Sequence, residues 1–131
     1  MKTSESTVEL TKALIKFHAL VGNIKKSANN PFFKSSYAPL NEVLGVIAKP
    51  LQESGLTFVQ FPSGRYELTT RLMHMSGEYM EASFKMPPAK EDPQGHGSVI
   101  TYQRRYALTS ILGLNDGDDD GNAASRPQQR R

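Results

Sequence analysis

Apolar residues recur every three or four positions in the first part of the chain and predict a helix. The positions are Leu10, Leu14, Phe17, Val21 and Ile24. This spacing places side chains on one face of an α-helix. Ser6, followed three residues later by Glu9, matches the capping box that starts many helices. We therefore expect a helix that begins behind Ser6, ends at the charged pair Lys25-Lys26 and turns its apolar stripe to the core.

A second helix is predicted over residues 39–54, behind a loop at residues 27–39 that is rich in Asn, Ser and Pro. Pro39 suits the first helical turn, where a missing N–H costs nothing. Pro50 lies inside the pattern, so we expect it to kink or split the helix. Gly55 is a typical helix stop.

Polar and apolar residues then alternate and predict three strands, at residues 56–61, 65–75 and 78–86. Leu68 and Leu72 fall on one face of the middle strand, whereas Glu67 and Arg71 fall on the other. The segment PSG and the pair Ser76-Gly77 are turn signals between the strands. We therefore expect an antiparallel meander with one apolar and one charged face.

Residues 100–114 predict a third helix that carries an arginine in an unexpected place. Its apolar stripe consists of Ile100, Ala107, Leu108, Ile111 and Leu112. Arg104 falls inside this stripe, and Arg105 lies just beyond its edge. Isolated burial of a guanidinium is too costly. Arg104 is therefore expected either to form a buried ion pair, with Glu42, Glu53 or an acidic strand residue, or to lie at the lip of a groove where it binds phosphate.

The opposite side of this helix carries Val99, Tyr102 and Tyr106 and is also partly apolar. A helix with two such faces usually contacts two partners. One is expected to be its own sheet, and the other a neighbouring subunit or a nucleic acid.

The order helix, helix, three strands, helix predicts one α+β domain over residues 1–114. A loop is expected at residues 87–98, before the last helix. Residues 115–131 have no apolar periodicity and predict a disordered tail, first acidic and then basic.

Composition narrows the classes of function. The chain has no Cys, which excludes disulfides and cysteine zinc sites. It shows neither a membrane span nor a signal peptide, so we expect a cytoplasmic protein. The net charge is +3, and residues 1–114 hold 13 Lys/Arg against nine Asp/Glu. This mild excess permits a polyanionic partner without requiring one.

Catalytic and metal-binding motifs are weak. No nucleotide-binding phosphate loop is present, and His18, His74 and His96 are too scattered to predict a metal site. The acidic run at residues 116–120 matches the opening of a calcium loop, but Pro127 stands where that loop needs a Glu. We expect a solvated acidic tail, with a loose Mg²⁺ site or competition with DNA as the minor alternatives. No cofactor and no catalytic residue are predicted.

Residues 95–98, Gly-His-Gly-Ser, precede the last predicted helix. Free backbone amides there could hold a phosphate. A simple turn is the preferred interpretation.

Basic residues beside aromatic ones predict contacts with nucleic acid. Phe32, Phe33 and Tyr37 surround Lys34, and this combination suits base stacking with phosphate contact. The alternative is that the two phenylalanines fill the core. Arg71 and Lys85 share their strand faces with Glu67 and Glu81, so they either contact DNA or form cross-strand ion pairs.

Three segments resemble the ERF (essential recombination function) family of phage single-strand annealing proteins. The first, residues 30–56, has Phe-Lys-Ser, Tyr-Ala and a helix that ends before Gly-Leu. The second, residues 68–87, is a strand pair around Ser-Gly-Glu. The third, residues 92–122, runs from Gly-Ser through Thr-Tyr and Arg-Arg-Tyr-Ala-Leu to Leu-Gly-Leu and an acidic end. The third motif is the most specific.

The resemblance implies a protein that binds single-stranded DNA and anneals complementary strands without ATP, in homologous recombination of phage DNA inside the bacterial host. It also implies ring or filament homo-oligomers and a β-β-β-α core like that of ring-forming eukaryotic annealing proteins. Carried over to this chain, it makes Arg104 and Arg105 phosphate contacts, and Tyr102 and Tyr106 stacking or interface residues. Relatives continue into a longer C-terminal region. If that region recruits a host single-strand-binding protein, this chain either lacks that partner or is truncated.

The predicted DNA-binding set is Lys34, Tyr37, Arg71, Lys85, Tyr102, Arg104, Arg105 and Tyr106. A monomer of charge +3 binds phosphates weakly, whereas a ring repeats the same basic patch. Two alternatives remain open. One is a metal-dependent nuclease that uses Asp116, Asp118, Asp119 and Asp120. The other is a purely structural oligomer in which the last helix only joins subunits.

Overall fold

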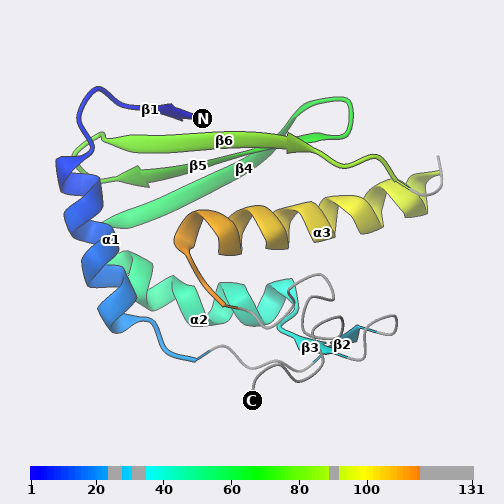
Figure 1. Ribbon diagram of the computed structural model, residues 1–131, viewed down its shortest axis with the longest axis horizontal. Helices are drawn as coiled ribbons and strands as arrows, with labels where there is room; N and C mark the ends of the chain where they lie inside the picture. The colour runs from blue at the N-terminus through cyan, green and yellow to red at the C-terminus, as the bar shows by residue number, and fades with distance from the viewer. Residues whose placement is uncertain (24–27, 31–34, 89–91, 116–131) are drawn as a thin grey trace, which may run out of the picture.

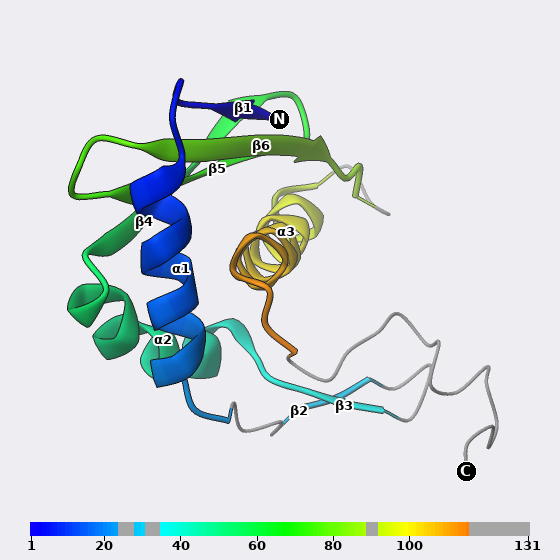
Figure 2. The same ribbon diagram turned by 60° about the vertical axis from the view of Figure 1, so that its left-hand side comes forward.

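The computed structural model describes residues 1–23, 28–30, 35–88 and 92–115. The elements are β1 (Lys2–Thr3), α1 (Val8–Leu20), β2 (Ala28–Asn30), β3 (Ser35–Tyr37), α2 (Leu40–Glu53), β4 (Leu56–Gly64), β5 (Glu67–His74), β6 (Tyr79–Lys85) and α3 (Pro93–Leu112). A four-stranded antiparallel sheet of order β1-β6-β5-β4 lies on one side, and the three helices lie together on the other (Figures 1 and 2). The predicted α+β class is confirmed, but the sheet has four strands rather than three.

The meander formed by β4, β5 and β6 is confirmed, together with its two faces. Val59 pairs with Arg71, and Arg71 with Glu81, so these residues line up across the face that the helices leave uncovered. Leu68 and Leu72 are buried on the helix side. The contrast between the two faces specifies the register, because a slip of one residue would turn every leucine outward.

The first hairpin turn was predicted at the wrong place. β4 continues through the segment PSG to Gly64, and the chain reverses at Arg65 and Tyr66. Pro62 is tolerated because β4 is the outermost strand, where a missing N–H breaks no ladder hydrogen bond. Tyr66 has a φ of 62°, a left-handed conformation that is uncommon for a residue other than glycine.

The N-terminal strand β1 was not predicted. Its two residues, Lys2 and Thr3, pair with Glu81 and Met80 of β6. Ser4 extends the contact, because its backbone N–H donates to the carbonyl of Tyr79 and its hydroxyl accepts from the Tyr79 N–H. Hydrogen bonds to β6 therefore hold the N-terminus at the edge of the sheet.

Helix α1 is shorter than predicted and does not use the predicted capping box. It begins at Val8 with Thr7 as its N-cap, and it ends at Leu20 rather than at the lysine pair. The backbone N–H of Leu10 donates instead to the Glu78 carboxylate at 2.8 Å. This carboxylate comes from the turn before β6, so a long-range contact replaces the local cap.

Helix α2 runs unbroken through Pro50, so the expected split is wrong. The buried residues Val43, Ile47 and Leu51 hold the helix on both sides of the proline. Their packing outweighs the loss of one helical hydrogen bond. Gly55 follows the helix with a φ of +73°, which confirms it as the stop.

Helix α3 begins at Pro93, well before the predicted start. The Asp92 side chain accepts a hydrogen bond from the Gly95 N–H at 2.6 Å and caps the helix. Gly95 and Gly97 therefore lie inside a helix, in place of the expected loop. The simple turn preferred for residues 95–98 is therefore wrong. The alternative, a phosphate held by free backbone amides, loses the Gly95 N–H, because that group already donates to Asp92.

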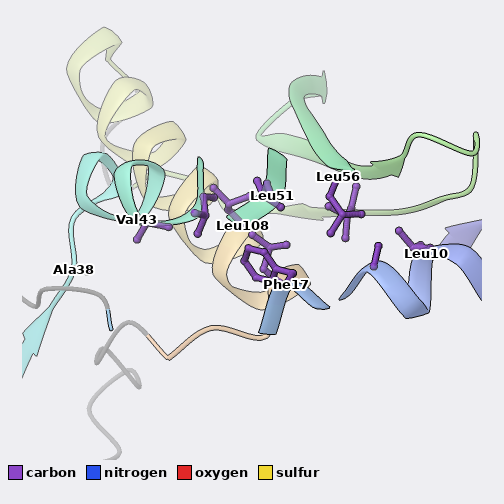
Figure 3. Close-up of a cluster of buried hydrophobic side chains, with 11 residues drawn as sticks. Leu10, Phe17, Ala38, Val43, Leu51, Leu56 and Leu108 are labelled. Carbon is purple, nitrogen blue, oxygen red and sulfur yellow. The ribbon is translucent and has the colours of Figure 1, made fainter. Parts of the chain in front are cut away.

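The core forms where the three helices meet the sheet. Figure 3 shows core members from four elements: Leu10 and Phe17 of α1, Val43 and Leu51 of α2, Leu56 of β4 and Leu108 of α3. At the end of α3, the His18 ring nitrogen Nε2 lies 2.8 Å from the carbonyl oxygen of Leu112. The core thus fixes α3, which carries half of the candidate DNA-binding residues.

Candidate nucleic-acid interface

Helix α3 is packed on two sides, between the sheet and α2 (Figure 1). On the sheet side, the Gln103 amide donates to the carbonyl of Tyr66 at 2.8 Å and to that of Phe84 at 3.4 Å. On the other side, Leu108 and Leu112 are fully buried in the core. The expectation of two partners is therefore half confirmed: one is the sheet, and the second is α2 of the same chain.

This double packing reverses the predicted roles of the two arginines. Arg105, not Arg104, lies on the side of Leu108 and Leu112 and is 2% exposed. Arg104 is half-buried. The sequence placed Arg104 at the centre of a single apolar stripe. However, α3 buries two sides, one against the sheet and one against α2. Arg104 lies between these two buried sides and is therefore only partly covered. The predicted buried ion pair of Arg104 with Glu42 or Glu53 does not form.

Arg105 is buried against aromatic rings. Its guanidinium carbon lies 5.2 Å from the ring centre of Tyr102 and 4.9 Å from that of Tyr106. The two rings meet edge to face at 4.8 Å, and their hydroxyls lie 3.3 Å apart. Tyr102 is 38% exposed. Arg105 therefore supports a pair of tyrosines of which one reaches the surface.

Arg104 leaves the helix on a different flank. Side chains two positions apart on an α-helix diverge by about 160°, so Arg104 points away from both Tyr102 and Tyr106. Tyr106 lines a hollow together with β6 residues, which places the tyrosines on the β6 side of α3. Arg104 lies toward β4, because its backbone carbonyl accepts from Gln60 of β4, and Ile100, one turn earlier, lines a hollow with Pro62 and Gly64 of that strand. Within the described part of the chain, no hydrogen bond or ion pair involves the Arg104 guanidinium.

The hollow beside Tyr106 has a volume of about 570 Å³ and separates α3 from the inner face of β6. Its walls are mostly apolar and include Met80, Phe84, Tyr106 and Ile111. No described residue fills this space.

Arg71 and Lys85 lie on the outer face of the sheet, away from α3. Arg71 Nε lies 2.7 Å from Glu81 Oε1, and its guanidinium is 4.0 Å from the ring centre of Tyr79. The cross-strand ion pair is thus confirmed for Arg71. Lys85 faces Glu67 in the same register. The sheet separates these two residues from the α3 group, so the predicted set does not form one surface.

Tyr37 ends the strand β3, which pairs with β2 in a short hairpin inside the predicted loop. Figures 1 and 2 show β2 and β3 on the helix side of the sheet, near the start of α2. Lys34, Phe32 and Phe33 fall outside the described residues, as does the side chain of Tyr37. Their predicted roles stay predictions.

Sequence comparison now assigns the family. The model of the ERF superfamily matches residues 10–131. The chain belongs to the ERF superfamily. No curated protein and no solved structure matches it.

Membership in the ERF superfamily implies a role in single-strand annealing and recombination. The described residues bear on two other kinds of function. They contain no group of three His, Asp or Glu side chains that could hold a metal ion. None of the helices in the described ranges is long and apolar enough to cross a membrane. The acidic run at residues 116–120 lies outside these ranges.

Two glutamines that position α3 in this ERF-superfamily protein were missed in the sequence. Gln103 connects α3 to the turn before β5 and to β6, as described above. Gln60 of β4 donates to the carbonyl of Arg104 at 3.1 Å and to the Thr70 hydroxyl at 2.9 Å. Gln60 occupies an inward position of an alternating strand, and a polar residue there was an available signal. Gln103 had no comparable signal, because polar residues surround it in the sequence.

Proposed function

We propose that this protein is an ATP-independent, non-enzymatic single-strand DNA-binding and annealing protein. It acts on phage DNA in homologous recombination in the cytoplasm of the bacterial host, as a ring or filament of identical copies. In this proposal α3 carries the principal contacts to the sugar-phosphate backbone.

The observation that carries the proposal is that α3 presents both a partly exposed arginine, Arg104, and a surface tyrosine, Tyr102. Arg104 is partly exposed, and its guanidinium makes no contact with a described carboxylate. Guanidinium groups bind phosphate without reading the base. The exposed Tyr102 ring provides a stacking surface of the kind that contributes about 1–3 kcal/mol per base in single-strand binders. Annealing requires this combination, because the base edges must stay free for the second strand.

The buried position of Arg105 changes its proposed role. A guanidinium that is 2% exposed does not reach a phosphate in this conformation. Its contacts with both rings fix the orientation of Tyr102 and Tyr106. Arg105 therefore acts as a positioning residue for the stacking surface.

The helix side of the sheet suits DNA better than the outer face. Glu81 neutralises Arg71 on the outer face, and Glu67 lies opposite Lys85. Carboxylates at these places repel phosphate and reduce what the two cations contribute. We therefore assign Arg71 and Lys85 a secondary role. Lys34 and Tyr37 belong to the segment around the β2–β3 hairpin and join the proposed α3 site.

The small net charge supports an oligomer. A protein of charge +3 offers few phosphate contacts, so its single-site affinity for DNA is low. Identical copies along one strand add their contacts through high effective concentration. Sequence-independent binding then follows without a strongly basic monomer.

The first test is a fluorescence titration of oligo-dT at two salt concentrations, with Arg104→Ala compared with wild type. Loss of one phosphate contact per copy should weaken binding and lower the salt slope by about 1. Lys12→Ala, which removes a lysine from α1, is the charge-matched control and should bind like wild type. Light scattering should show the same oligomer for all three proteins.

The same experiment separates the two alternatives. A structural oligomer would keep its size and show no salt-dependent affinity for DNA. A nuclease would shorten the oligonucleotide when Mg²⁺ is added and stop when Asp116, Asp118, Asp119 and Asp120 are changed to Asn. Equal binding by Arg104→Ala and wild type would remove α3 from the proposed site.

A further inference from the structure

The two kinds of DNA contact on α3 point to different sides of the molecule. Arg104 lies on the β4 side, whereas Tyr102 and Tyr106 lie on the β6 side next to the apolar hollow. The body of the helix separates them. A single strand that follows one flank of α3 therefore contacts either the arginine or the tyrosines of a given copy, but not both.

β4 is an edge strand of the sheet, and its outer side is open to pairing with another strand. No described strand pairs with the outer side of β4, whose sequence LTFVQFPSG contains no charged residue. Val59 and Phe61 are 43% and 42% exposed. The backbone groups of Phe58 and Gln60 point outward, because those of Val59 and Phe61 form the ladder to β5. Proteins usually protect such edges with lysine, proline, a bulge or a covering segment. Pro62 and the register irregularity between Pro62 and Gly64 protect the end of β4 in this way, so the stretch open to pairing is residues 56–61.

The sheet is also open on the β6 side. β1 and Ser4 cover β6 at Tyr79, Met80 and Glu81, and among the described residues no strand pairs with Ser83 and Lys85. Hollows flank this stretch on both faces of the sheet: the inner one of about 570 Å³ and an outer one of about 430 Å³. Met1, Ala82 and Ser83 line both hollows. An added strand here would place alternate side chains in the two hollows.

We propose that the β4 side of one copy packs against the β6 side of the next, so that each DNA site contains Arg104 of one copy and Tyr102 and Tyr106 of its neighbour. This inference rests on the proposed function. The contact joins two different surfaces, and repetition of it generates a ring or a filament. A two-fold contact between two β4 strands would leave the β6 edge and its hollows uncovered. Contact between unlike edges covers both.

Mixed oligomers test the shared site directly. Arg104→Ala and Tyr102→Ala proteins are each purified, unfolded together at equal amounts and refolded, and oligo-dT binding is measured against each variant alone. With shared sites, about a quarter of the contacts in the mixture combine an intact Arg104 with an intact Tyr102. The mixture should then bind several-fold more tightly than either parent. Sites confined to single copies contain one defect each, so no gain would appear.

The outcomes separate this inference from the proposed function. If both variants lose affinity and the mixture shows no gain, the shared site is wrong and the proposed function stands. If neither variant loses affinity, the proposed α3 site itself fails, and the shared site fails with it. Circular dichroism confirms folding of each variant, and Lys12→Ala on α1, which lies outside the proposed site, should behave like wild type.

Crosslinking tests the contact without reference to DNA. The chain has no native Cys, so Val59→Cys on β4 and Ser83→Cys on β6 introduce unique thiols. A short bismaleimide should convert the double variant into a ladder of covalent oligomers. An equal mixture of the single variants should stop at dimers, and each single variant alone should stay monomeric on a denaturing gel. Dimers from Val59→Cys alone would reveal a two-fold β4 contact and overturn the proposal.

Discussion

Arg105 illustrates how a small domain can bury a guanidinium. Its planar group rests on two tyrosine rings, and cation–π contacts of this kind are worth about 2 kcal/mol when they are desolvated. The neighbouring Arg104 has no such support and stays half-exposed. Two adjacent arginines thus have different roles, one in positioning the tyrosines and one in the proposed contact with phosphate.

This difference predicts opposite effects of the two alanine substitutions. Arg105→Ala should lower the free energy of unfolding by about 2 kcal/mol, because the rings lose their support. Arg104→Ala should change it by less than about 0.5 kcal/mol, as is usual away from buried contacts. Urea unfolding followed by circular dichroism measures both. Equal stability of Arg105→Ala and wild type would show that the cluster does not hold α3.

The assignment of the two arginines was beyond reach of the sequence. A helical wheel shows which residues share a face, but not how many faces become buried. Gln103 and Leu108 lie on nearly opposite sides of α3, and both are buried. Only the packing of α2 below α3 and the sheet above it reveals this arrangement. In contrast, strand alternation in the sequence correctly placed Arg71 and Glu81 on the outer face of the sheet.

At the scale of elements, strands were predictable where the two faces differ strongly in polarity, as in β5 and β6. Errors arose at the ends of elements. Pro62 was read as a turn because the sequence does not say that β4 is the outer strand. The pair Asp92-Pro93 did carry the signal of a helix start, an N-cap followed by proline, and it was overlooked because two glycines follow. β1 is too short to show a pattern.

The contact between Glu78 and α1 gives a prediction at this scale. Glu78→Ala removes the acceptor for the Leu10 N–H and should cost about 1 kcal/mol, the usual value of a helix cap. Glu78→Gln keeps an acceptor oxygen and should retain most of that stability. Denaturant midpoints of the three proteins give the comparison. If the alanine variant unfolds no earlier than the glutamine variant, the cap contributes nothing.

At the scale of the whole molecule, the sheet order places the two open edges on opposite sides of one domain. α3 lies between them and presents a cation to one side and aromatic rings to the other. This arrangement suits assembly of identical copies along a strand of DNA. The small net charge and the family resemblance predicted an oligomer from the sequence. They did not predict which surfaces of the copies meet, because the strand order decides which strands lie at the edges of the sheet.

The most direct measurement is the annealing of two complementary oligonucleotides that carry a donor and an acceptor fluorophore, with chelator present and no nucleotide added. The account predicts that wild-type protein speeds the rise of energy transfer well above the spontaneous rate. Arg104→Ala should lose most of this acceleration, while Lys12→Ala keeps it. Pairing at the spontaneous rate with saturating wild-type protein bound to both strands would contradict the annealing function.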